Sequence, residues 1–148
     1  MAFLKSYFGK TTTVEPLNDV IKSKIERLVV SKLDDYEKNY TKELFNVYKE
    51  WKSTEKKFTF EELDQEAHNR AGVKSFKQTV TNHTWSEVQD DVDREVKNQT
   101  DNDMAIKASN VAGKKTVSVI VSQTVDAGIK KISKKGEERK RPKNKSIS

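Results

Sequence analysis

One run of apolar residues constrains this chain more than any other feature of its sequence. Nine apolar or aromatic side chains recur between Ile21 and Trp51 at intervals of three or four residues, with a mean step of 3.75. That spacing puts all nine on one face of an α-helix, which has about 3.6 residues per turn. The step exceeds the roughly 3.5 of a coiled-coil heptad, so the pattern predicts a long amphipathic helix packed on a bundle. The nine are Ile21, Ile25, Val29, Leu33, Tyr36, Tyr40, Leu44, Val47 and Trp51.

The residues before this run predict where the long helix starts. We expect it to extend from about Leu17 to Trp51, with Pro16 in its first turn, where the missing N–H of proline costs no hydrogen bond. Asp19 suits the positive end of the helix dipole.

The pair Thr59 and Glu62 predicts the start of a second helix. The side chains of such a pair can each accept a hydrogen bond from an unpaired backbone N–H of the first helical turn, which is the capping-box pattern. Phe58 and Leu63 occupy the positions of a hydrophobic staple around this start. Gly72 is the predicted end of the helix, because glycine tolerates the left-handed conformation of a C-cap.

A second pair with the same spacing, Thr84 and Glu87, predicts a further helix start. A short helix from Val73 to about Asn82 is expected before it. The helix that Thr84 begins should fade in residues 98–102, which are rich in turn-forming side chains.

The last apolar segment, residues 104–132, fits either a helix or a strand. Val117, Val119 and Val121 alternate as in a strand, whereas six apolar residues share one helical face, and the helix is favoured. Gly113 is expected to interrupt the helical pattern. The six are Val117, Ile120, Val121, Val125, Ile129 and Ile132.

Together these patterns predict an all-α fold, an irregular helical bundle built on the long N-terminal amphipathic helix. A chain of 148 residues supports one modest core. We divide it into an amphipathic N-terminal segment (1–12), an α-helical domain (13–132) and a disordered basic tail (133–148).

Nothing in the sequence has the pattern of a catalytic or metal site. The absence of cysteine excludes disulfides and thiolate chemistry. His68 and His83 belong to no paired spacing and are expected to be exposed or satisfied by neighbours. The acidic run 90–95 lacks the central glycine of a calcium loop, so a solvated face is expected there. We therefore expect a non-enzymatic protein without metal or cofactor.

The net charge of the chain, +6, comes from its C-terminal end. Residues 130–148 contain nine basic side chains against two acidic ones, a net charge of +7 that leaves −1 for the first 129 residues. Such a distribution is typical of an interaction tail. The predicted anion-binding or nucleic-acid-binding residues are Lys130, Lys131, Lys134, Lys135, Arg139, Lys140, Arg141, Lys143 and Lys145.

The N-terminal segment is the other candidate contact. In a helix, its rings and leucine would share one side with lysine near the edge, which suits the interface of an anionic membrane. Docking of this segment on the bundle is the main alternative, and a mitochondrial targeting segment is another. The predicted membrane-contact residues are Phe3, Leu4, Lys5, Tyr7, Phe8 and Lys10.

These features predict a helical adaptor or scaffold protein. It would be intracellular and cytoplasmic, bind protein partners through helical faces, and attach peripherally to membranes through its two ends. The alternative is a nuclear or nucleic-acid-associated accessory protein whose tail binds the phosphate backbone. No aromatic residue follows Trp85, so that binding would be electrostatic and blind to sequence. The oligomeric state stays open.

Overall fold

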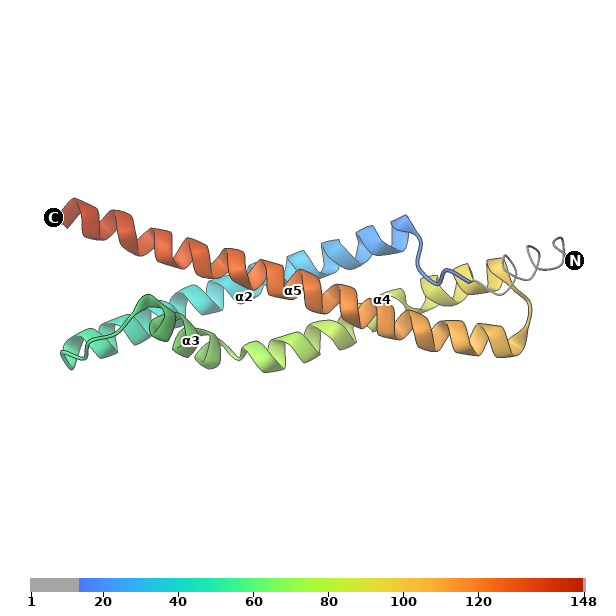
Figure 1. Cartoon of the computed structure of the whole chain (residues 1–148), viewed down its shortest axis with the longest axis horizontal. Coiled ribbons are helices and arrows are strands. Elements are labelled where there is room, and N and C mark those ends of the chain that lie inside the picture. Colours follow the sequence, from blue (N-terminus) through green and yellow to red (C-terminus); the bar gives the residue numbers. More distant parts are fainter. Residues whose placement is uncertain (1–13, 148) are drawn as a thin grey trace, which may run out of the picture.

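The computed structural model describes residues 14–147, and the side chains of residues 14–139. This part of the chain contains only helices and their connections, which confirms the predicted all-α class. Residues 104–132 are helical and form no strand. The helices are α2 (Asp19–Ser53), α3 (Phe60–Ala71), α4 (Val73–Gln99) and α5 (Asp103–Ile147) (Figure 1).

The helices form an elongated bundle with three legs. α2 is the first leg, α3 and α4 together make the second, and α5 is the third (Figure 1). α4 is antiparallel to α2, because Lys24 contacts Asp91 whereas the earlier Asn18 contacts the later Glu95. α5 is parallel to α2: Gly113 lies beside Pro16, Gly128 beside Leu33 and Gly136 beside Tyr40.

A stripe of mostly β-branched side chains from each leg forms the core. These side chains recur about every four residues, so each helix buries one face, as an amphipathic helix does. Space between the legs is filled mainly by valine and isoleucine, with two tyrosines from α2. The fully or nearly fully buried members include Ile21, Ile25, Val29, Leu33, Tyr36 and Tyr40 of α2, Val80, Val88, Val92 and Val96 of α4, and Val117, Val121, Val125 and Ile132 of α5.

The start of α2 differs from the prediction. Pro16 precedes the helix, and Asn18 is the N-cap, since its side-chain oxygen accepts a hydrogen bond from the backbone N–H of Ile21 at 2.8 Å. An asparagine at this position satisfies a donor that the helix leaves unpaired. Pro16 instead lies beside Gly113 of α5, where the small glycine leaves room for its ring.

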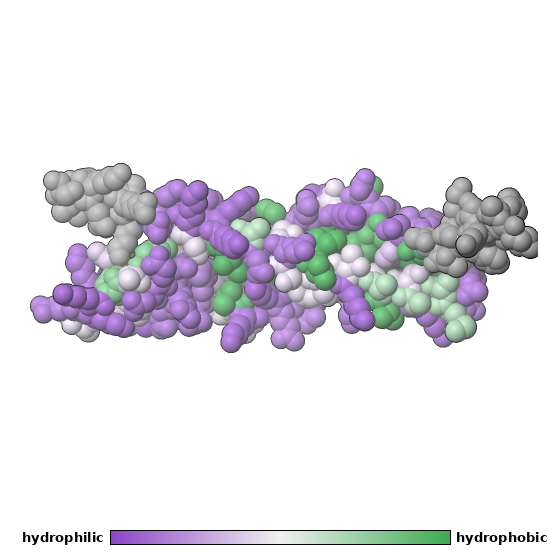
Figure 2. All heavy atoms as spheres, viewed as in Figure 1, coloured by the Kyte–Doolittle hydropathy of each residue, from purple (hydrophilic) through white to green (hydrophobic). Residues whose placement is uncertain are grey.

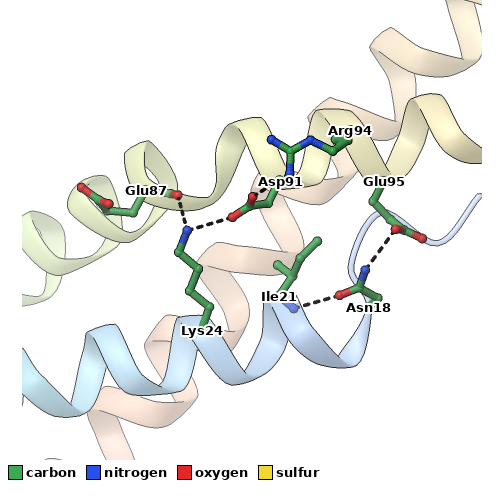
Figure 3. A network of polar contacts seen from close by, with 7 residues as sticks. All are labelled: Asn18, Ile21, Lys24, Glu87, Asp91, Arg94 and Glu95. Atoms are coloured by element: carbon green, nitrogen blue, oxygen red, sulfur yellow. Dashed lines mark hydrogen bonds and ion pairs between the residues drawn. The ribbon is translucent and has the colours of Figure 1, made fainter.

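Polar contacts to α4 hold the first turns of α2 in place (Figure 3). The Asn18 amide donates to Glu95 at 3.0 Å, and the Lys24 ammonium donates to the Glu87 carbonyl at 3.1 Å and to Asp91 at 2.9 Å. Arg94 contacts the same Asp91 carboxylate at 3.4 Å. These contacts set the register between the first two legs.

The capping box of α3 is confirmed. Thr59 Oγ1 accepts from the Glu62 backbone N–H at 3.2 Å, and the Glu62 carboxylate accepts from the Thr59 backbone N–H at 3.3 Å. Gly72, with φ of 79°, ends α3 as predicted. α4 begins immediately after it, so Gly72 is the hinge between the two halves of the second leg.

The predicted helix boundary at Thr84 is wrong. α4 is continuous from Val73 to Gln99, and Thr84 lies fully buried inside it with no hydrogen-bond partner for its hydroxyl among the described residues. The apolar face that runs from Val80 to Val96 in steps of four is unbroken, with Thr84 as one of its members. Packing of this face keeps the turn helical, so the local capping pattern is not used.

The sequence predicted a break in the last helix at Gly113, and this prediction is wrong. The helix passes through it without a break. A side chain at this position would meet Val92 and Pro16, so the glycine serves close packing against α4 and the residues before α2.

The predicted start of a disordered tail at Ser133 is also wrong. α5 continues to Ile147. Ser133 donates a hydrogen bond to Asp64, Gly136 is buried beside Tyr40, and Arg139 contacts Thr41. Residues 133–139 belong to the folded bundle because contacts with α2 and α3 anchor them. The sequence of these residues alone does not predict such contacts.

Candidate functional site

Five of the predicted anion-binding residues lie on the last described turns of α5. We call Lys130, Lys131, Lys134, Lys135 and Arg139 the basic ridge. All five are exposed. The side chains of Lys140, Arg141, Lys143 and Lys145 lie outside the described part, although the helical backbone continues through these positions. Helix register places positions 130, 134, 141 and 145 along one line, opposite the buried Ile132 and Gly136.

Only the inner edge of the basic ridge is paired within the described structure. Glu37 of α2 pairs with Lys135 at 3.7 Å and with Arg139 at 3.4 Å, and Arg139 donates to the Thr41 hydroxyl at 2.9 Å. Lys130, Lys131 and Lys134 have no ion pair in the described part of the chain. Their positive charges therefore remain available to an external anion.

The predicted membrane-contact residues from Phe3 to Lys10 lie outside the described residues. The structure begins at Val14, which packs against the core. The next residue, Glu15, exchanges two hydrogen bonds with Gln99 at the end of α4, at 2.9 and 2.7 Å. The described chain therefore starts at the end of the bundle opposite the C-terminal end of α5 (Figure 1).

The structure also contains a polar cluster that the sequence did not predict. It joins Tyr36 and Tyr40 of α2, Asp64 and His68 of α3, and Ser133 of α5. Tyr36 bonds to His68 Nδ1 at 2.6 Å, and Ser133 Oγ lies 2.8 Å from His68 Nε2. Tyr40 and Ser133 both donate to the Asp64 carboxylate, the latter at 3.0 Å. One hydrogen-bonded group thus ties together all three legs just below the basic ridge.

The hydrogen bonds fix the roles of the groups in the polar cluster. Ser133 gives its proton to Asp64, so its oxygen accepts from His68 Nε2–H. The other ring nitrogen, Nδ1, shares a hydrogen bond with the Tyr36 hydroxyl at 2.6 Å. The rings also stack, with centroids of Tyr40 and His68 4.3 Å apart. Each polar atom of the group has a partner, as buried polar groups require.

Burial and hydrogen bonding act in opposite directions on Asp64. Burial disfavours its ionised form, but hydrogen bonds from His68, Tyr40 and Ser133 stabilise the carboxylate more, so the pKa of Asp64 lies below its usual value. Burial, with the nearby Asp64 charge, raises the pKa of Tyr36 and Tyr40 well above the ordinary range of a phenol. Both tyrosines therefore keep their protons and remain donors.

The polar cluster contains the residue types of a Ser–His–Asp triad in a different arrangement. In a triad the serine hydroxyl donates to one ring nitrogen and the carboxylate accepts from the other. Here Ser133 and Asp64 both approach Nε2, at 2.8 and 3.3 Å, while Tyr36 occupies Nδ1. The serine proton points to the carboxylate. This geometry supports a structural junction between helices and not an activated serine.

Acid should weaken this junction. Because the pKa of Asp64 is lower in the folded state than in the unfolded chain, the ionised carboxylate stabilises the fold above about pH 4. That stabilisation is lost as the pH falls through the folded-state pKa. We expect Asp64→Asn to cost about 1–2 kcal/mol in urea unfolding at neutral pH and much less at about pH 3. An equal loss at both pH values would contradict the role assigned to the carboxylate.

The acidic run 90–95 holds separate partners and forms no common site. Asp91 pairs with Lys24, Asp93 accepts from Lys97 and Asn110, and Glu95 accepts from Asn18. Across the described residues, no group of histidine, aspartate and glutamate side chains is arranged to hold a metal ion. Nor does any helix in that part of the chain have the length and apolar character needed to cross a membrane.

No protein family model, curated protein or solved structure is significantly similar to this chain. The functional argument therefore depends on the geometry of the basic ridge and of the polar cluster.

Proposed function

We propose that this protein is a non-enzymatic helical scaffold, organised around α2, that attaches peripherally to anionic membranes. The basic ridge carries the proposal. It presents five exposed cations on consecutive turns of α5, of which Lys130, Lys131 and Lys134 have no ion pair within the described residues. A polybasic segment near an anionic leaflet gains about 1 kcal/mol per charge, so three charges support reversible binding.

Two further features support attachment through this end. The polar cluster fastens α5 at Ser133, one residue before Lys134, so the ridge is held on a folded helix. The visible surface at that end of the molecule is mainly hydrophilic (Figure 2). A preformed ridge loses less conformational entropy on binding than a disordered tail with the same charges.

The N-terminal segment is the second proposed contact, through the rings of Phe3, Tyr7 and Phe8. Because the described chain begins at the far end of the bundle, simultaneous use of both contacts favours an orientation with the long axis along the membrane (Figure 1). The rest of the helical surface would remain available to protein partners.

Flotation with liposomes tests the proposal. We expect the protein to float with anionic vesicles in moderate salt and to remain behind with neutral ones. Neutralising Lys130, Lys131 and Lys134 to alanine should weaken partitioning about a hundredfold, from about 1 kcal/mol per charge. The matched control replaces Lys107, Lys114 and Lys115, which are exposed lysines in the other half of the same helix. It should bind nearly as well as the wild type.

The same variants distinguish the alternative function. If duplex DNA binds the protein and anionic vesicles do not, the basic ridge serves nucleic acid and the membrane proposal is wrong. Equal losses in the ridge variant and the control would show that only overall charge matters. Phe3→Ser with Phe8→Ser tests the N-terminal contact separately and should reduce flotation without affecting DNA binding.

A further inference from the structure

The turn between α2 and α3 carries a cluster of aromatic rings at the same end of the molecule as the basic ridge. We call this surface the aromatic tip. It consists of Phe45, Tyr48, Trp51 and Phe58 with the neighbouring Lys49, Lys52 and Lys56. Phe58 packs edge-on against Trp51, with centroids 5.4 Å apart, and against Tyr48 at 6.1 Å. Phe45, one turn earlier, is 52% exposed.

A lysine ammonium lies near each ring on the α2 side of the aromatic tip, and that of Lys52 donates a hydrogen bond to the Tyr48 hydroxyl at 3.2 Å. Lys49 lies 4.8 Å from the Phe45 ring centre, Lys52 lies 5.4 Å from that of Tyr48, and Lys56 lies 4.0 Å from that of Trp51. These distances lie within the range of cation–π interactions. The surface thus alternates apolar rings with ammonium groups, which is the composition of a membrane–water interface anchor.

The fold brings this surface to the basic ridge. α5 runs parallel to α2, and Arg139 contacts Thr41, one turn before Phe45. From there α2 continues toward Trp51 and α5 toward Ile147 in the same direction, so the aromatic tip and the end of α5 lie at one end of the molecule (Figure 1). The basic end of α5 has no aromatic residue in its own sequence, and the fold supplies them from α2.

We propose that the aromatic tip is a further contact with the anionic bilayer, beside the basic ridge: Phe45 and Trp51 enter the interface while the basic ridge binds the head groups. This inference rests on the proposed membrane attachment. Covered ring faces argue against base stacking, because Lys49 and Lys56 occupy positions where a base would lie. Entry into a lipid interface requires no free ring face, and lysines there extend to the phosphates.

Packing at the turn alone does not account for Phe45. Phe58 contacts both Tyr48 and Trp51 and closes the turn, whereas the Phe45 ring is half exposed and its described ring contact is with Lys49. Phe45 is therefore the residue whose replacement tests membrane contact with the least effect on folding.

The two tryptophans of the chain permit a direct test. Trp51 lies at the aromatic tip, and Trp85 packs against the core in α4. In Trp85→Phe, the remaining Trp51 should shift its emission to shorter wavelength on anionic vesicles and be quenched by brominated acyl chains. In Trp51→Phe, Trp85 should show neither change. Quenching of both tryptophans, or of neither while the protein still floats, would overturn the proposal and leave the basic-ridge attachment intact.

A pair of variants on α2 gives an independent measurement. Phe45→Ser should weaken partitioning into anionic vesicles about tenfold, the value of burying one aromatic side chain in part. Val30→Ser is the matched control, because Val30 is 49% exposed, nearly as much as Phe45, and lies away from both ends of the same helix; it should leave partitioning unchanged. Equal partitioning of wild type and Phe45→Ser would refute the tip contact. Absence of vesicle binding by the wild type would refute both proposals, and Trp51 quenching by single-stranded DNA without vesicle binding would assign the tip to nucleic acid.

Discussion

Replacing Tyr40 with alanine should lower the free energy of unfolding by about 4 kcal/mol, within the usual range for truncating a buried ring. Tyr40 is 1% exposed and lies where α2, α3 and α5 meet. Its ring stacks on His68 at 4.3 Å, and its hydroxyl lies where a side chain at Gly136 would otherwise be placed. Truncation to alanine therefore leaves a cavity at this junction.

Loss of the Tyr40 hydroxyl adds a polar cost to the cavity. The hydroxyl donates to Asp64, so the alanine variant leaves a partly buried carboxylate with one donor fewer. Tyr40→Phe removes only this hydrogen bond and should cost about 1–2 kcal/mol. Thermal unfolding should show a drop of roughly 10 °C for the alanine variant and a smaller one for phenylalanine. Equal effects of the two variants would mean that the hydrogen bond and not the ring holds the three legs together.

The helical class of the fold could be predicted because it depends on local periodicity. The stripe through Ile21, Val29 and Tyr40 lies on the buried side of α2, and the Thr59 capping box forms as expected. Both signals are complete within a few turns of chain. The errors at Thr84, Gly113 and Ser133 have a common physical cause, because at each position contacts with a distant helix determine the local structure.

The candidate site shows the same limit. The spacing of Tyr36 and Tyr40, and of Asp64 and His68, is i to i+4, which places each pair on one helical face. Two features of the sequence could have indicated the polar cluster. One is the pair of tyrosines within an apolar stripe, and the other is the Asp–His pair beside the buried Leu63 and Ala67. Their meeting with Ser133, 65 residues beyond His68, depends on the parallel arrangement of α2 and α5. Periodicity within a single helix carries no information about that arrangement.

Gly128→Leu should be the most disruptive single change in α5. A Cβ atom at this position would lie 2.4 Å from one methyl of Leu33, 3.1 Å from the other and 3.3 Å from its Cγ. Leu33 is itself buried in the core, so its side chain has little room to move. We expect a loss of about 3 kcal/mol, because overpacking of a dense core costs about 1–3 kcal/mol and a leucine adds three carbons beyond the Cβ.

Helix propensity acts against this loss of stability, so variants at positions 127 and 128 must be compared to isolate the packing effect. Glycine inside a helix is about 1 kcal/mol less favourable than alanine or leucine, so steric cost must exceed that gain before any destabilisation appears. Gly128→Ala already places a Cβ atom 2.4 Å from the buried Leu33, so its steric cost should exceed the gain in helix propensity and leave a net loss of about 1 kcal/mol, smaller than that of Gly128→Leu. Ala127→Leu adds a leucine side chain at the neighbouring exposed position and should be almost neutral. Urea unfolding of the three variants separates helix propensity from packing. If Gly128→Leu and Ala127→Leu have the same free energy of unfolding, α5 does not approach α2 at Leu33. The parallel contact that also brings Ser133 to His68 would then be wrong.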